Sequence, residues 1–80
     1  MSKIIPLPAK KVVKALEKIG FEQIRQRGSH LFLRHPDGRT TIIPMHSTEN
    51  IGTGMINKII KDAKITRDEW IELIKSLILF

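Results

Sequence analysis

Two short breaks between three strand-like segments constrain the fold of this chain more than any other feature. Gly28-Ser29 separates the first segment from the second, and Pro36-Asp37-Gly38 separates the second from the third. Glycine and aspartate tolerate the backbone conformations of tight turns, and proline presets φ at the second turn position. Neither break is long enough for a crossover helix, so the three segments are expected to form an antiparallel meander.

The three segments have the composition of strands. They run over Phe21–Arg27, His30–His35 and Arg39–Met45, and the third is rich in β-branched residues. Pro44, near the end of the third segment, indicates a sheet edge or a strand terminus. Strand alternation puts the residues of the second segment on two opposite faces, with His30, Phe32 and Arg34 on one and Leu31, Leu33 and His35 on the other.

Helical periodicity marks the chain on both sides of the meander. Over Ala9–Ile19 the apolar residues recur at helical spacing, and Gly20 follows as a helix-stop signal. After a polar loop over His46–Gly54, a second helix is expected from about Thr53. Its predicted apolar face is formed by Met55, Ile56, Ile59, Ile60 and Ala63.

A third helix is predicted from about Arg67, because Thr66-Arg67-Asp68-Glu69 fits the capping box. This helix is apolar around most of its circumference, which leaves two interpretations open. Either it packs on the body of the domain, or it presents apolar side chains to a partner, namely Trp70, Leu77, Leu79 and Phe80. The predicted fold is a single α+β domain over residues 1–80, ordered α-β-β-β-α-α, with helices on one face of the sheet.

Positive charge is concentrated in the first three-fifths of the chain. Of the net charge of +6, residues 1–48 contribute all, with nine basic and three acidic residues, whereas residues 49–80 carry five of each. Four of the five arginines lie between Arg25 and Arg39. This clustering is expected of a protein with a phosphate-rich partner, although a solvated surface that maintains solubility has the same composition.

The residue inventory excludes several classes of enzyme. Without cysteine the chain has no disulfide, no thiolate zinc site and no cysteine nucleophile, and the cytoplasm is the expected compartment. The Walker A, GxGxxG and HExxH motifs are absent. The longest apolar run, Leu77–Phe80, is far shorter than the roughly 20 residues of a membrane span. The spacing of the histidines fits no zinc template, so we expect no metal and no cofactor.

Three histidines remain as candidates for chemistry at neutral pH, because imidazole titrates near pH 6.5 when unperturbed. Gly28-Ser29-His30 is the most suggestive context, since the glycine permits a sharp turn and the serine supplies a small hydrogen-bonding group. RNA carries its own nucleophile, the 2′-hydroxyl, so an imidazole beside arginines could cleave it without a metal. A purely structural role for His30 is the alternative.

The other two histidines have weaker contexts. His46, in Pro44-Met45-His46-Ser47, could approach the same site from the end of the third strand, and a second imidazole would allow acid and base to be divided between two groups. Its alternative role is that of a loop residue that caps backbone groups. His35, beside Pro36 in a turn, is expected to be exposed and without function.

The ordered set of these motifs resembles the HicA (YcfA) toxins of bacterial and archaeal toxin–antitoxin pairs. The segments that carry the resemblance lie between Ala9 and Leu73: Leu16–Phe21, Arg25–His30, Arg34–Arg39, Ile43–His46 and Ile51–Gly54. The resemblance implies a double-stranded-RNA-binding-domain-like fold and a ribosome-independent endoribonuclease, an mRNA interferase. It also implies a HicB-like antitoxin that covers the active site, and it maps the catalytic histidine of the family to His30.

Two features depart from the family. Leu7-Pro8 replaces the usual polar entry to the first helix, and the apolar stretch after Leu73 is less typical. This stretch leaves open a homodimer contact or an antitoxin contact.

The residues indicate His30 and a phosphate-bearing partner, and the resemblance adds the expectation of a toxin that cleaves mRNA, here without a metal. His30 would act as the base on the ribose 2′-hydroxyl or as the acid on the leaving oxygen, and Ser29 would orient it. The residues predicted to bind RNA phosphates are Lys10, Lys11, Arg25, Arg27 and Arg34. The alternative is a non-catalytic RNA-binding module of the same fold. A DNA-binding regulator is disfavoured, because the acidic start of the third helix would repel phosphate.

Overall fold

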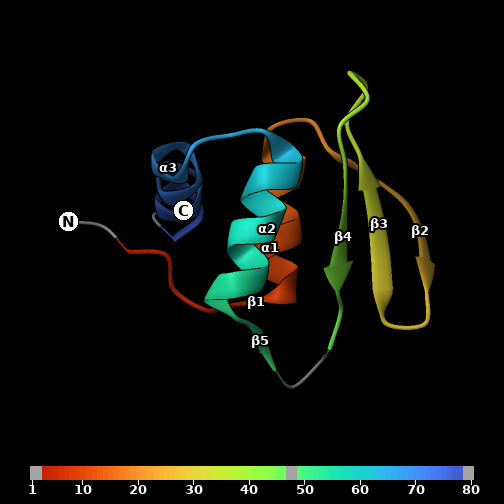
Figure 1. The fold of residues 1–80 in the computed structure, drawn as a ribbon, viewed down its shortest axis with the longest axis horizontal. Coiled ribbons are helices and arrows are strands. Elements are labelled where there is room, and N and C mark those ends of the chain that lie inside the picture. The colour runs from red at the N-terminus through yellow and green to blue at the C-terminus, as the bar shows by residue number, and fades with distance from the viewer. Residues whose placement is uncertain (1–2, 47–48, 79–80) are drawn as a thin grey trace.

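The computed structural model describes residues 3–46 and 49–78, and its elements follow the predicted order (Figure 1). In chain order they are β1 (Leu7–Pro8), α1 (Ala9–Lys18), β2 (Glu22–Arg27), β3 (His30–Arg34), β4 (Thr40–Pro44), β5 (Asn50–Ile51), α2 (Thr53–Ala63) and α3 (Arg67–Ile78). The two-residue strands β1 and β5 were not predicted. They pair antiparallel, Leu7 with Ile51, and connect the start of α1 to the start of α2.

Strands β2, β3 and β4 form the predicted antiparallel meander. The β2–β3 turn has Gly28 at φ 57°, which is the positive φ that the first central residue of a type II′ hairpin turn requires. In the second turn the Gly38 N–H donates a 2.9 Å hydrogen bond to the His35 carbonyl, and Gly38 has φ 104°. Both sequence breaks therefore act as turns, and they set the register of β3 against both neighbours.

The hydrophobic core lies between one face of the sheet and the helices α1 and α2 (Figure 1). It is formed by side chains that are at most 3% exposed on β3, β4 and both helices, including Leu31, Leu33, Ile43, Val12, Leu16, Ile56 and Ile59. Met55, which was predicted to lie on this buried face, is 40% exposed. In a helix of 3.6 residues per turn, Met55 lies about 90° from the centre of the stripe formed by the other four residues.

Helix α3 packs on the side of α1 and α2 that is opposite the sheet (Figure 1). Its capping box is confirmed, because the Thr66 N–H donates to Glu69 Oε1 at 2.8 Å and the Glu69 N–H donates to Thr66 Oγ1 at 3.0 Å. Trp70 is 1% exposed, so the structure supports packing on the domain and contradicts the presentation of Trp70 to a partner. Leu77 packs partly buried against the core, while Leu79 and Phe80 lie outside the described residues.

The arrangement has three layers, with the sheet, the α1/α2 pair and α3 in succession. A helix, a three-stranded antiparallel meander and a second helix on the same face make the predicted double-stranded-RNA-binding-domain-like fold. In the described part of the chain, no helix has the length and apolar character to cross a membrane.

Candidate nucleic-acid interface

The second face of the sheet carries no helix in the described structure (Figure 1). Cross-strand partners share a face, so the register identifies the residues that lie on this open face. They are Glu22, Arg25, Arg27, His30, Phe32, Arg34, Thr40, Ile42 and Pro44. Each is exposed or half-buried, and on β3 they alternate with the buried Leu31 and Leu33. This alternation confirms the predicted division of the faces.

His30 is exposed at the first position of β3, directly after the Gly28-Ser29 turn. Its cross-strand neighbours are Arg27 on β2 and Pro44 on β4. The Ser29 carbonyl accepts a hydrogen bond from the Met45 N–H, which ties the turn to the segment after β4. Among the described residues, the side-chain hydrogen bond at this turn runs from Gln26 Nε2 to the Gly28 carbonyl at 3.0 Å, and none joins the Ser29 hydroxyl to the imidazole. The backbone around His30 is therefore fixed, while its ring faces solvent.

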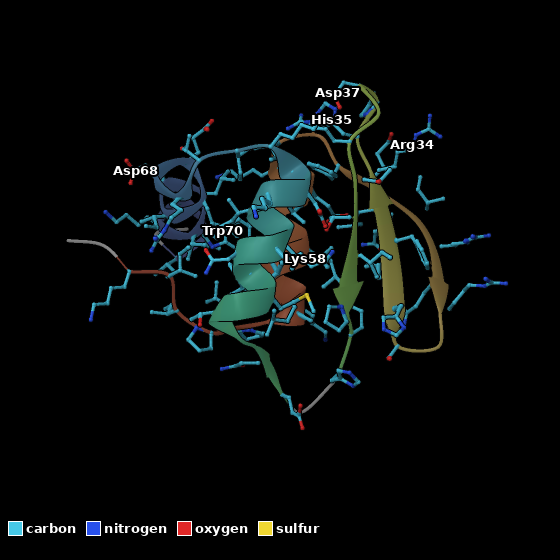
Figure 2. All side chains as sticks on the ribbon, in the orientation of Figure 1. Arg34, His35, Asp37, Lys58, Asp68 and Trp70 are labelled. Atoms are coloured by element: carbon cyan, nitrogen blue, oxygen red, sulfur yellow. The ribbon has the colours of Figure 1, made fainter. Side chains whose placement is uncertain are left out.

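Three arginines share the open face with His30. Arg25 and Arg27 come from β2 and Arg34 from β3, and Figure 2 shows Arg34 on the side of the sheet away from the helices. Within residues 3–46 and 49–78, none of the three forms an ion pair with a carboxylate. Glu22 is the one acidic residue that the register places on this face. The face is therefore a surface of positive potential that suits a polyanion.

Arg25 reaches this face because β2 contains an irregularity. The pairing with β3 shifts between Gln23 and Arg25, so Ile24 has no cross-strand partner. A bulge of this kind re-aims the residues that follow it. The Arg25 guanidinium carbon lies 5.3 Å from the centroid of the Phe32 ring, within the range of a cation–π contact.

The fourth arginine of the sequence cluster has a different environment. Arg39 Nη1 donates to the Ala63 carbonyl at 2.6 Å, at the end of α2, and Arg39 Nε lies 2.9 Å from Asp37 Oδ2. Hydrogen bonds from the side chain and the backbone of Arg39 lower the pKa of Asp37 below its ordinary value of 3.8. Arg39 therefore fixes the β3–β4 turn against α2, and the charge that the open face gains from this cluster comes from the other three arginines.

His35 is not the exposed residue that the sequence predicts. Its side chain is 18% exposed, and it lies with Asp37 in the turn at one end of the sheet (Figure 2). The ring Nε2 lies 2.9 Å from the Ile19 carbonyl and donates to it, so in the neutral ring Nδ1 accepts from the Asp37 N–H at 3.1 Å. The ring also meets Phe21 edge to face, with centroids 5.3 Å apart. Its partners Ile19 and Phe21 are distant in sequence, which is why a local pattern did not reveal this role.

The two candidate lysines lie on different surfaces. Lys10 lines a hollow at the start of α1 together with Pro8, Met45 and His46. Lys11 lines a second hollow, between α1 and α3, with Lys14, Lys18, Ser76 and Leu77. In that second hollow, Lys18 Nζ donates to Ser76 Oγ at 2.7 Å. The predicted phosphate-binding residues therefore divide into three arginines on the open face with His30, one lysine near the His30 end of the sheet and one lysine on the helical side.

His46 is exposed and lies just beyond the end of β4. Met45 precedes His46 and Ser29 precedes His30, and the Met45 N–H donates a hydrogen bond to the Ser29 carbonyl. The backbone at the two histidines is therefore close. The hollow that His46 lines also contains Glu49 and Asn50. The structure brings His46 to the same end of the sheet as His30, and its participation in chemistry stays a prediction.

Within the described residues, no group of three or more histidine, cysteine, aspartate or glutamate side chains is placed to hold a metal ion. The open face also contains three apolar side chains that the sequence analysis did not select as functional, namely Phe32, Ile42 and Pro44. Strand alternation placed Phe32 beside His30 on one face. The alternation did not show that, in the described structure, no helix would cover this face.

A family model described as the HicA toxin of bacterial toxin–antitoxin systems matches residues 9–65. The matched segment runs from the start of α1 to just beyond α2, and it contains the whole open face with His30. Strand β1 and helix α3 lie outside it. A search of the curated proteins finds no significant match.

Proposed function

This chain belongs to the HicA toxin family of bacterial toxin–antitoxin systems, and on that premise we propose that it is a metal-independent endoribonuclease that cleaves mRNA. Its place in the family makes it the toxin of a pair, with an antitoxin as partner. The observation that supports the enzymatic proposal best is the position of His30, exposed on the open sheet face together with three arginines that form no ion pair within the described residues.

The proposed reaction uses His30 for proton transfer and the ribose 2′-hydroxyl of the RNA as nucleophile. As general base, the neutral His30 ring takes the proton of a ribose 2′-hydroxyl while the 2′-oxygen attacks the adjacent phosphorus. The bond from phosphorus to the 5′-oxygen breaks, and the 5′-oxygen leaves with a proton from solvent or a second acid. The products are a 2′,3′-cyclic phosphate and a 5′-hydroxyl end. In the alternative role, a protonated His30 donates the proton to the leaving 5′-oxygen. Acid–base assistance of this kind contributes roughly 10²–10⁴ in rate.

The arginines supply the electrostatic part of the proposal. Arg27 is the cross-strand neighbour of His30, so a phosphate at the imidazole is within reach of its guanidinium. A guanidinium binds phosphate oxygens in bidentate fashion and stabilises the negative charge that develops on them. Arg25 and Arg34 lie on the same face, farther from the start of β3, and would hold flanking phosphates. Lys10 would extend this track from the start of α1, and Ser29 would orient His30 through the fixed turn.

A HicB-like antitoxin would inhibit the enzyme by covering the same face. The open face offers a partner exposed arginines together with an exposed isoleucine, Ile42, and a half-buried phenylalanine, Phe32. An antitoxin that places acidic side chains over the arginines would exclude RNA and neutralise the surface. Competition between a labelled RNA and the antitoxin for the toxin tests this part of the proposal.

The nuclease proposal is tested with labelled mRNA in the presence of EDTA. We expect fragments from the unmodified protein and a loss of about 10²–10⁴ in rate for His30→Ala, with an unchanged circular dichroism spectrum. The matched control is Arg67→Ala, which removes an exposed cation at the start of α3 and should leave cleavage unchanged. Binding of RNA without fragments would support the alternative, a non-catalytic RNA-binding module. Cleavage by His30→Ala at the unmodified rate would refute the role of His30.

A further inference from the structure

We propose that Phe32 is a base-stacking residue, which holds the nucleotide next to the phosphate at His30 and restricts the enzyme to unpaired RNA. This inference rests on the proposed nuclease function and assigns a specificity role within the same site. It concerns the middle of the open face, where an aromatic ring lies between an arginine and an isoleucine from the neighbouring strands.

The surroundings of Phe32 are those of a binding platform. Its ring is half-buried on the open face, and its cross-strand partners are Arg25 on β2 and Ile42 on β4. Ile42 is 39% exposed, and the Arg25 guanidinium carbon is 5.3 Å from the ring centroid. An apolar surface thus lies beside the arginines of β2 and β3, and the combination of an aromatic ring with neighbouring cations is the one that single-stranded nucleic-acid sites use.

The core of the domain does not require this ring. The other described phenylalanine, Phe21, is 2% exposed and contacts His35 and Arg39. Leu31 and Leu33 already fill the buried face of β3. An aromatic side chain at the exposed position between them gains less from burial than either leucine. A ligand with a flat apolar surface would complete its burial.

The spacing along β3 connects the platform to the chemistry. His30 and Phe32 are two residues apart on one face, so their Cα atoms are separated by about 6.5–7 Å. One extended nucleotide covers a similar length. A phosphate held at His30 and Arg27 therefore leaves the adjoining base over Phe32.

A base can reach this ring only when it is unstacked. In an RNA duplex the faces of the bases are covered by their neighbours, and proteins read duplexes through phosphates and 2′-hydroxyls. In single strands the bases splay out and stack on aromatic rings or on guanidinium planes. Arg25 fits such a complex, because its guanidinium, which lies over the Phe32 ring in the free protein, can give way to a base and stack on the other side of it.

The test measures binding separately from cleavage. Fluorescence anisotropy with a short labelled RNA that is 2′-O-methylated throughout prevents cleavage, because the nucleophile is blocked. We expect Phe32→Val to weaken binding between about fivefold and about 150-fold, since stacking contributes roughly 1–3 kcal/mol per base. Phe32→Tyr should bind within about twofold of the unmodified protein. Ile78→Ala removes a side chain on α3 that is 61% exposed and should leave the affinity unchanged.

A second measurement varies the RNA, first with the unmodified protein and then with Phe32→Val. Single abasic substitutions along the same RNA should weaken binding at one position, next to the phosphate that is cleaved in the unmethylated RNA, and this position effect should vanish in Phe32→Val. A duplex of the same sequence should bind Phe32→Val and the unmodified protein equally. The abasic scan of the unmodified protein needs no substitution at Phe32, so it stands even where Phe32→Val lowers the stability of the domain.

The outcomes separate this inference from the nuclease proposal. Equal affinity of Phe32→Val and the unmodified protein, with His30-dependent cleavage intact, would refute the stacking role of Phe32. The exposed part of the ring would then be a contact for a protein partner. Loss of affinity in Phe32→Val without cleavage by the unmodified protein would overturn the nuclease proposal and retain the platform. An unmodified protein that neither binds nor cleaves RNA would overturn both.

Discussion

Replacement of His35 by alanine should destabilise the domain strongly, although a histidine beside a turn proline looks dispensable in the sequence. The imidazole connects three parts of the structure. Nε2 donates to the Ile19 carbonyl at 2.9 Å, Nδ1 accepts from the Asp37 N–H at 3.1 Å, and the ring packs edge to face on Phe21. Alanine removes all three contacts at once.

The magnitude follows from these contacts. A hydrogen bond contributes a net stability of about 1 kcal/mol, and an edge-to-face aromatic pair contributes about 0.5–1.5 kcal/mol. The side chain is only 18% exposed, so the Ile19 carbonyl loses its partner in a partly buried position. Together these terms give a loss of about 2–4 kcal/mol in the free energy of unfolding. A domain of this size has a total of roughly 4–12 kcal/mol.

Urea unfolding measures this loss directly. Trp70 is the only tryptophan and is 1% exposed, so its fluorescence reports the exposure of the core on unfolding. With a slope of about 1 kcal/mol per molar urea, the midpoint should fall by roughly 2 M or more. The matched control is His30→Ala, which removes an exposed imidazole and should change stability by less than about 0.5 kcal/mol. Equal midpoints for the two variants would refute the structural role of His35.

Three further predictions concern the scaffold. Gly20→Ala should lower the thermal midpoint, because φ at Gly20 is +104° and the new Cβ would lie 2.7 Å from His35 Nε2. The expected loss in the free energy of unfolding is about 1–3 kcal/mol, and an unchanged midpoint in a calorimetric scan would contradict it. Thr66→Ala removes the hydroxyl that accepts a 3.0 Å hydrogen bond from the Glu69 N–H, and it should lower the free energy of unfolding by about 0.5–2 kcal/mol. Guanidinium unfolding can resolve this loss, and an unchanged free energy would show that the cap contributes nothing. The pKa of Asp37 is lowered in the folded state, first by the side-chain hydrogen bond from Arg39, so its stabilisation is present above the ordinary value of 3.8 and is lost as the pH falls through the lowered pKa. Unfolding free energies measured across this range should therefore fall less steeply with acid in Asp37→Asn, and identical slopes would argue against the ion pair.

The elements were predictable because their signals are local. The apolar periodicity of α1, the turn residues Gly28 and Gly38, and the capping box before α3 each act within a few residues of the structure that they specify. The fold class followed from the short connections. The family resemblance agreed with it over the same segments.

The features that were missed depend on contacts between distant segments. Strands β1 and β5 have two residues each, which is too short for alternation to show, and their pairing joins Leu7 to Ile51. Met55 lies at the edge of an apolar stripe, where only the position of the neighbouring layer decides its exposure.

In the candidate site too, the features with a local sequence signal were predicted and those that depend on distant segments were not. Alternation along β3 predicted that His30 and Arg34 share a face. The separation of Lys10 from Lys11 follows from helix geometry, since successive residues differ by about 100° and so face different neighbours. The sequence alone did not show that Lys10 would face the end of the sheet near His46 while Lys11 would face α3.

The central claim is that an imidazole on the open face cleaves RNA with the 2′-hydroxyl as nucleophile. Its most direct test is a single RNA oligonucleotide and its copy with one 2′-deoxy substitution at the cleaved position, each incubated in EDTA with the unmodified protein and with His30→Ala. We predict that the unmodified protein cuts the RNA to a 2′,3′-cyclic phosphate and leaves the substituted position intact, and that His30→Ala cuts neither at a comparable rate. Cleavage of the 2′-deoxy position, or cleavage of the RNA by His30→Ala at the unmodified rate, would contradict the account.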